Sequence, residues 1–133
     1  MITFDFKDGN GPVLAHKHPN GGGWVADTAT VADTAYVGPN AWVYGNAQVF
    51  DIARVYGYAQ IFDNAKVYGK AWVYGNALVF DDARVYGDAR VYGDARVSDH
   101  ARVSGNARVS GDKTNEDIFI EMNGKRYKLV EVK

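Results

Sequence analysis

The stretch that decides the fold is VYGDARVYGDARVSDHARVSGNARVSGD, which occupies residues 85–112. Within it a valine and an alanine each return every six residues, while the positions between them vary. The same register extends without gaps from Trp24 to Lys113, as fifteen units of six residues. The second position is Val in fourteen units and Ile61 in the other, and the sixth is Ala in every unit except the last. Self-similarity at a fixed period indicates a repeat architecture.

Each unit has the pattern of a short strand followed by a tight corner. The Ala at the sixth position and the Val at the second position of the next unit are two residues apart, so on a strand they face the same side. The first and third positions face the opposite side. The fourth and fifth positions are mostly Gly, Asp and Asn, which favour turns and tolerate positive φ. A Gly or Asp every six residues disfavours an α-helix, so the sequence predicts an all-β chain with Val and Ala facing inward.

The pattern resembles the hexapeptide repeat of left-handed parallel β-helices, in which an aliphatic residue is followed four positions later by a small one. Pairs with this spacing include Val25 and Ala29, Val43 and Ala47, and Val85 and Ala89. The resemblance covers residues 24–113 and implies a left-handed parallel β-helix in which three units form one triangular coil. We therefore expect about five coils, and at about 4.8 Å between stacked strands a prism roughly 20–25 Å long.

The segments outside the repeat are expected to cap the ends of the β-helix, where strand edges would otherwise stay unpaired. We divide the chain into residues 1–23, an N-terminal strand and capping segment, residues 24–113, the β-helix, and residues 114–133, a C-terminal β-hairpin. In the first of these segments apolar residues alternate as in a short strand, at Ile2, Phe4 and Phe6.

The hairpin prediction depends on Asn123-Gly124, a strong signal for a two-residue turn. Pairing about this turn places Ile118 opposite Leu129, Ile120 opposite Tyr127, and Glu121 opposite Arg126. The two apolar pairs would then share one face of the hairpin, as expected for a strand pair that packs against the end of a solenoid.

Outward-facing aromatic residues recur at the third position of the unit. With three units per coil they stack into three ladders, Tyr44-Phe62-Phe80, Phe50-Tyr68-Tyr86 and Tyr56-Tyr74-Tyr92. Each Phe in these ladders precedes Asp and each Tyr precedes Gly, which we interpret as two types of corner. Rings suit pleated surfaces and stack on neighbouring strands, so the ladders can be structural, but they can also form an oligomer interface or a ligand surface.

One face of the prism is more apolar than the other two. It combines residues from the first and third positions, namely Trp24, Trp42, Tyr44, Phe62, Leu78 and Phe80. A contiguous apolar patch on a protein surface usually marks an interaction site. We therefore predict that these six residues form the interface of a homo-oligomer.

Arginine occupies the first position of the last five units, from Arg84 to Arg108. The repeat spacing places Arg84 beside Arg102, and Arg90 beside Arg108, with two tyrosines nearby. Guanidinium groups next to rings can stack on a base and bind phosphate. The predicted site for a small anionic ligand, such as a nucleotide, consists of Arg84, Arg90, Arg102, Arg108, Tyr86 and Tyr92. A solvated face with mixed charges is the alternative.

The three histidines are the candidates for chemistry. His16 and His18 would face one side of an extended segment and could hold a metal or supply a base, but no third ligand has an obvious spacing. His100 occupies a corner position otherwise filled by Asn or Asp. The resemblance implies two enzyme classes as possible functions. Acyltransferases with this repeat usually interrupt the coils with a loop, and γ-class carbonic anhydrases use three zinc-binding histidines. Because no loop interrupts this repeat, we assign no catalytic residue, metal or cofactor and keep an acyltransferase-like enzyme with a histidine base as the alternative.

Composition limits the remaining function classes. The chain has 133 residues, a formal net charge of −1 and no cysteine, so its overall charge does not indicate long nucleic acid or an anionic membrane. It has no run of about 18 apolar residues and no signal-peptide pattern at its start, which predicts a soluble, cytoplasmic protein.

Uninterrupted repeats of this style are similar to small proteins of bacteria and their phages. We therefore expect a non-catalytic, self-associating binding or scaffold protein, in the manner of a phage or prophage accessory protein, that sequesters a small anionic ligand between protomers.

Overall fold

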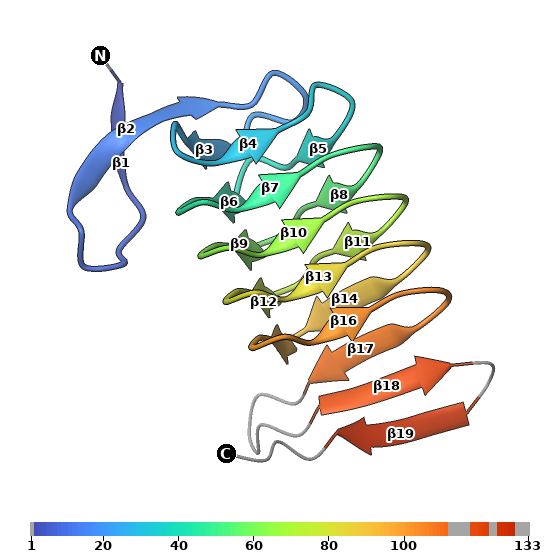
Figure 1. The fold of residues 1–133 in the computed structure, drawn as a ribbon. Helices are drawn as coiled ribbons and strands as arrows, with labels where there is room; N and C mark the ends of the chain where they lie inside the picture. Colours follow the sequence, from blue (N-terminus) through green and yellow to red (C-terminus); the bar gives the residue numbers. More distant parts are fainter. Residues whose placement is uncertain (1, 112–117, 123–124, 130–133) are drawn as a thin grey trace.

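The computed structural model describes residues 2–111, 118–122 and 125–129, the last two segments as backbone. In these residues the regular structure is entirely β, and the repeat winds into a stack of parallel coils (Figure 1). The expected all-β solenoid of about five coils is confirmed. Within the same part of the chain no helix is long and apolar enough to cross a membrane.

Three sheets run along the stack, and each forms one face of the solenoid. The first face is β1 (Thr3–Asp5), β2 (Pro12–Lys17), β3 (Trp24–Ala26), β6 (Trp42–Val43), β9 (Gln60–Ile61), β12 (Leu78–Val79) and β15 (Arg96–Val97). The second face is β4 (Thr30–Val31), β7 (Gln48–Val49), β10 (Lys66–Val67), β13 (Arg84–Val85) and β16 (Arg102–Val103). The third face is β5 (Tyr36–Val37), β8 (Arg54–Val55), β11 (Trp72–Val73), β14 (Arg90–Gly93), β17 (Arg108–Gly111), β18 (Ile118–Met122) and β19 (Lys125–Leu129).

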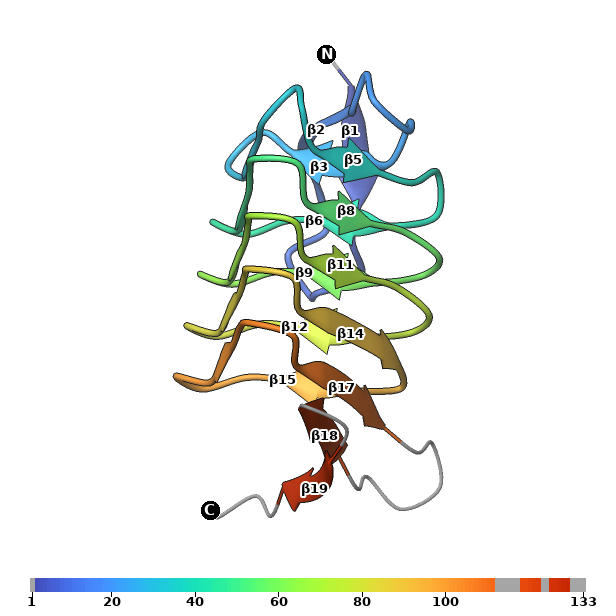
Figure 2. The same ribbon diagram turned by 90° about the vertical axis from the view of Figure 1, so that its right-hand side faces the viewer.

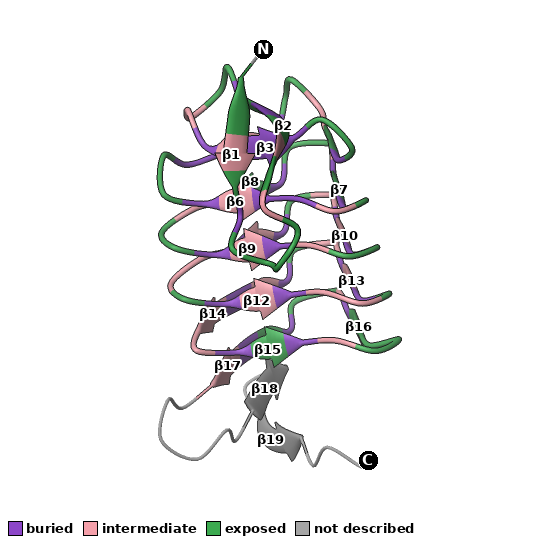
Figure 3. Cartoon of the chain, turned by 90° about the vertical axis from the view of Figure 1, so that its left-hand side faces the viewer, coloured by how far each residue is buried: buried purple, intermediate pink, exposed green. Residues whose placement is uncertain are grey.

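The strand register confirms that three units form one coil. Neighbouring repeat strands are parallel and pair residues 18 positions apart, such as Trp72 with Arg90 and Gln48 with Lys66. In Figures 1, 2 and 3 the repeat strands that face the reader run to the right while the chain descends, which is the sense of a left-handed coil. The winding therefore agrees with the one that the resemblance implies.

Valine and alanine fill the interior along the whole stack. The side chains of Val43, Val67 and Val91 have no exposed surface, and neither do the corner alanines of the middle coils. In Figure 3 the buried positions recur at the same place on every coil. Each fully buried valine side chain stabilises the fold by about 1.5 kcal/mol or more relative to an exposed one. The inward half of the repeat is thus explained by packing alone.

The three expected ladders of stacked rings are also confirmed. Successive ring centroids lie 4.7 to 5.3 Å apart, with interplanar angles of 9° or less, in Tyr44-Phe62-Phe80, Phe50-Tyr68-Tyr86 and Tyr56-Tyr74-Tyr92. This distance matches the spacing of neighbouring strands. The stacking therefore follows directly from the parallel register.

The corners that follow Phe and those that follow Tyr in the ladders share one backbone conformation rather than the expected two. At the fourth position Asp63 (φ 56°) and Asp81 (φ 57°) have the same left-handed backbone conformation as Gly57 (φ 64°) and Gly87 (φ 67°). Asp tolerates this region better than most residues because its short polar side chain can form local hydrogen bonds. The carboxylates of Asp51, Asp63 and Asp81 accept hydrogen bonds from the backbone N–H groups of Gly69, Asp81 and Asp99 in the next coil. Nothing in the structure explains why Phe accompanies Asp at these corners.

The N-terminal segment forms a hairpin that extends the first face. The expected strand is β1, which pairs antiparallel with β2, and β2 pairs antiparallel with β3 of the first coil. The second strand of this hairpin, β2, was not among the predicted elements. The hairpin provides the edge of β3 with a backbone partner.

At the other end β18 pairs antiparallel with β17, and β19 pairs antiparallel with β18. The backbone register pairs Ile118 with Leu129, Ile120 with Tyr127, and Glu121 with Arg126, as the sequence predicts. The Asn123-Gly124 turn and residues 112–117 lie outside the described residues.

Candidate functional site

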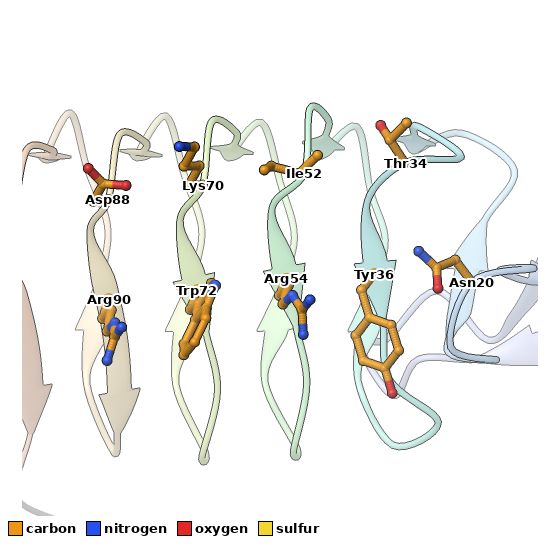
Figure 4. A pocket seen from close by; sticks show the side chains of 9 residues that line it. All are labelled: Asn20, Thr34, Tyr36, Ile52, Arg54, Lys70, Trp72, Asp88 and Arg90. Carbon is orange, nitrogen blue, oxygen red and sulfur yellow. The ribbon is translucent and has the colours of Figure 1, made fainter.

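A groove on the third face collects charged and aromatic side chains from four successive coils. Its volume is about 550 Å³. Figure 4 shows its lining as two rows, one on the strands (Tyr36, Arg54, Trp72 and Arg90) and one on the preceding corners (Thr34, Ile52, Lys70 and Asp88), with Asn20 at one end. The rows exist because the fifth position of one unit and the first position of the next both face outward at the same corner.

The indole of Trp72 lies between two guanidinium groups at the centre of the groove. Arg90 Cζ is 4.3 Å from the centroid of the Trp72 ring, and Arg54 Cζ is 5.9 Å from it. The strands β8 and β14 pair with β11 from opposite sides, so the two arginines approach opposite faces of the ring. Each contact has the geometry of a cation–π interaction. Stacking holds the planar guanidinium groups in place while their N–H donors remain directed away from the ring.

The groove carries more positive than negative charge. Arg54, Lys70 and Arg90 supply three cations, and Asp88 is the only carboxylate in its lining. Among the described residues, the salt bridges involve His16 and His100 and none of these three cations. The lining can therefore offer guanidinium and ammonium donors to an anion from solvent.

Tyr56 lies outside the lining of the groove and packs on its central tryptophan. Its ring stacks on Tyr74 at 4.9 Å and meets Trp72 edge-on at 6.4 Å. Burial raises the pKa of the Tyr56 hydroxyl above its ordinary value, and the neighbouring Tyr74 raises it further. The phenol is thus neutral at physiological pH and contributes packing rather than charge.

The six residues predicted for anion binding lie on two faces. Arg84 pairs with Arg102 on the second face, and Arg90 pairs with Arg108 on the third, as the repeat spacing predicts. Tyr86 and Tyr92 follow on the same two faces and end their ladders. Of these six residues, Arg90 lines the groove.

Sequence reasoning missed the partners of Arg90 in the groove. Arg54, Trp72 and Arg90 are spaced 18 residues apart at the first position of the unit, so their alternation along one ladder was visible in the sequence. What was not visible was the stacking of both arginines on one indole, or the approach of Lys70 from the preceding corner.

The apolar patch predicted as an oligomer interface is partly covered by the chain itself. Phe4 stacks on Trp24 at 4.6 Å, and Phe6 stacks on Tyr44 at 4.8 Å. Tyr44 is 6% exposed, and Trp24, Trp42 and Phe62 pack in the same cluster. Phe80 continues from this cluster by stacking on Phe62 at 5.0 Å, and both Leu78 and Phe80 are half-buried. The N-terminal hairpin thus covers part of the predicted patch, and the oligomer interface stays a prediction.

The Tyr44 hydroxyl is also engaged within the chain. It donates a hydrogen bond to Gln60 Oε1 at 2.9 Å. Burial raises its pKa to about 12, and the carboxylates of Asp8 and Asp63 add to the shift. The first face thus holds a neutral phenol in a largely apolar setting.

The three histidines have different environments. His16 is exposed, and its Nδ1 lies 2.8 Å from Asp27 Oδ1, whereas His18 is buried and its Nε2 lies 2.8 Å from the Ala35 carbonyl oxygen. The expectation that His16 and His18 face one side is wrong, because β2 ends at Lys17 and the chain turns inward. Among the described residues no group of three or more His, Cys, Asp or Glu side chains could hold a metal ion.

His100 lies on an acidic corner of the stack, in a second groove of about 590 Å³. Its Nδ1 is 3.7 Å from Asp82 Oδ2. The carboxylates of Asp63 and Asp81 in this groove already accept backbone N–H groups from the next coil. This corner is therefore explained by the hydrogen bonding of the solenoid.

Comparison with known proteins supports the repeat architecture. A family model described as the YdcK beta solenoid repeat matches residues 59–75, 71–87, 83–99 and 101–114. The first three matches begin twelve residues apart, which equals two of the six-residue units. No curated protein matches the chain, and no solved structure matches it. The chain is a repeat β-solenoid protein, and membership in the hexapeptide-repeat family stays a prediction.

Proposed function

We propose that this chain is a non-catalytic, self-associating binding or scaffold protein whose third face binds a small anionic ligand such as a nucleotide. The observation that carries the proposal is the position of Trp72 between the guanidinium groups of Arg54 and Arg90. Guanidinium groups bind phosphate through two parallel N–H donors. Because both groups already contact the indole, less side-chain entropy is lost when an anion binds.

The self-association part of the proposal is supported by exposed apolar side chains near both surfaces. Ile52, which lines the groove, is 53% exposed, and Leu78 and Phe80 are half-buried on the first face. A second copy that covered Ile52 would enclose an anion bound at Arg54. This arrangement would sequester the ligand between protomers.

The alternative, an acyltransferase-like enzyme, has one favourable observation. The His16 and Asp27 side chains lie 2.8 Å apart, as in a general base with its orienting carboxylate. His16 is outside the lining of both grooves. Acyl transfer from acyl-CoA that is lost in His16→Ala would favour the enzyme over the binding protein.

A thermal-shift titration with AMP, ADP and ATP tests the binding proposal. We expect Tm to rise with nucleotide concentration in the wild type, because a ligand at 100 times its Kd stabilises the native state by about 2.7 kcal/mol. The rise should be strongly reduced in Arg90→Ala and preserved in Arg96→Ala, which removes an exposed arginine from the first face. Equal shifts in the two variants, or none in the wild type, would contradict the proposal.

A further inference from the structure

We infer that the groove on the third face binds a linear oligophosphate chain that lies along the solenoid axis, with one phosphate on Arg54 and a different one on Arg90. This inference rests on the proposed function, because it specifies the ligand of the same site. It concerns the shared phosphate chemistry, which either an inorganic oligophosphate or a nucleoside polyphosphate could supply.

The separation of the two guanidinium groups is the first argument. The Arg54 and Arg90 Cζ atoms are 5.9 and 4.3 Å from the Trp72 centroid, so they lie no more than the sum, 10.2 Å, apart. Their strands are separated by two strand steps, which is about 9.5 Å. Within this limit the indole lies between the two groups and keeps them apart. Separate phosphate groups of one chain can therefore contact both arginines while each arginine keeps its contact with the indole.

Trp72 maintains this separation. The indole lies between the guanidinium groups and is held edge-on by Tyr56. The arginines therefore cannot both turn toward one small anion without losing a stacking contact. A ligand that satisfies both arginines must carry anionic groups at two places along the axis.

Lys70 supplies positive charge between the two arginines. It precedes Trp72 by two residues in the same coil, and Figure 4 shows it level with Trp72, between Ile52 and Asp88 in the row of corner residues. A chain that runs from Arg54 to Arg90 would pass this ammonium group. The order of cations along the axis thus matches a ligand that is charged along its whole length, as an oligophosphate is.

Asp88 makes the two ends of the groove differ in charge. It lies next to Lys70 in the row of corner residues, on the coil of Arg90, while the opposite end has the neutral side chains of Thr34 and Asn20. A carboxylate repels an additional phosphate. We therefore expect that chains longer than the span extend toward Tyr36, and that Asp88→Asn strengthens binding of every chain that reaches Arg90.

Isothermal titration calorimetry of the full chain at constant ionic strength tests this inference. The probes are orthophosphate, pyrophosphate, tripolyphosphate, ATP and a longer inorganic polyphosphate. We expect roughly tenfold or higher affinity for the longer polyphosphate than for pyrophosphate, because the second contact becomes intramolecular once the first has formed. Arg54→Ala and Arg90→Ala should each reduce the affinity for the longer chain to about that for pyrophosphate. Arg96→Ala is the matched control and should change neither.

The outcomes separate the inference from the function on which it rests. If all phosphates bind with equal affinity, or if Arg54→Ala weakens orthophosphate and the longer chain by the same factor, the bridging mode is wrong while anion binding stands. If no phosphate binds, both are wrong. ATP that binds like tripolyphosphate supports contacts through phosphate alone, whereas binding of the longer polyphosphate that is insensitive to Arg54→Ala overturns the two-point arrangement.

Discussion

The first and third faces of the solenoid are built from the same repeat but present different surfaces. Both have a ladder of three stacked rings on the same inner layer of Val and Ala. The first face is partly covered by the N-terminal hairpin, whose Phe4 and Phe6 pack on its aromatic residues. The third face keeps its groove open and holds arginines against its tryptophan. The repeat therefore sets where rings stack, whereas contacts from outside the repeat decide which face remains available to a ligand.

The largest expected effect is the loss of stability when Phe6 of the N-terminal hairpin is truncated. Phe6 is 2% exposed, so Phe6→Ala should lower the free energy of unfolding by about 3–5 kcal/mol. Tyr92→Ala truncates the half-buried last ring of the third-face ladder and should cost only about 1 kcal/mol. Urea denaturation followed by tryptophan fluorescence measures both. Similar losses in the two variants would show that the hairpin contributes no more than an ordinary ladder ring.

A second experiment uses the Tyr44 hydroxyl to test whether the N-terminal hairpin shields the first face from water. Its pKa is about 12 in the folded chain, compared with 10.0 for an ordinary tyrosine. Stability from this group is fully present below pH 10 and is lost as pH rises toward 12, because the unfolded chain releases the proton first. Denaturation curves from pH 9 to 12 should show about 2 kcal/mol less alkaline destabilisation in Tyr44→Phe than in the wild type. Parallel pH dependence in the two proteins would mean that Tyr44 is accessible to water.

The smallest expected effect concerns the part of the first face that the hairpin cluster does not include. If self-association uses this part, Leu78→Ser should weaken it about tenfold, which corresponds to 1.4 kcal/mol. Gln48→Ser, at an exposed position of strand β7 on the second face, is the control and should leave association unchanged. Sedimentation velocity over a range of concentrations measures both. A wild type that remains monomeric at high micromolar concentration would remove self-association from the proposed function.

Most of the fold could be predicted because it depends on local spacing. A Val and an Ala every six residues determine which side of each strand is buried, and the 18-residue coil follows once three units close a triangle. The ring ladders and the pairing of Arg90 with Arg108 follow from the same register. The hairpin strand Pro12–Lys17 could not be predicted in this way, because it pairs with β3 through backbone groups and has no repeat of its own.

The candidate site was predicted less completely. Arg90 was identified from its ladder, but Arg54, Lys70 and Trp72 were not assigned to a site, since a position in the repeat does not specify which neighbouring side chains stack. Similarly, Asp27 was not expected beside His16, because the two lie eleven positions apart and only the antiparallel pairing of β2 with β3 brings them together.

The sequence by itself determined that this chain is a β-solenoid with an aliphatic interior and outward ladders of rings, because a strict six-residue period leaves each position one environment. Only the tertiary structure decided that Phe4 and Phe6 cover part of the first face and that Arg54 and Arg90 flank Trp72 on the third. These contacts join residues from different coils or from outside the repeat. Their formation depends on packing in three dimensions, which a periodic pattern does not encode.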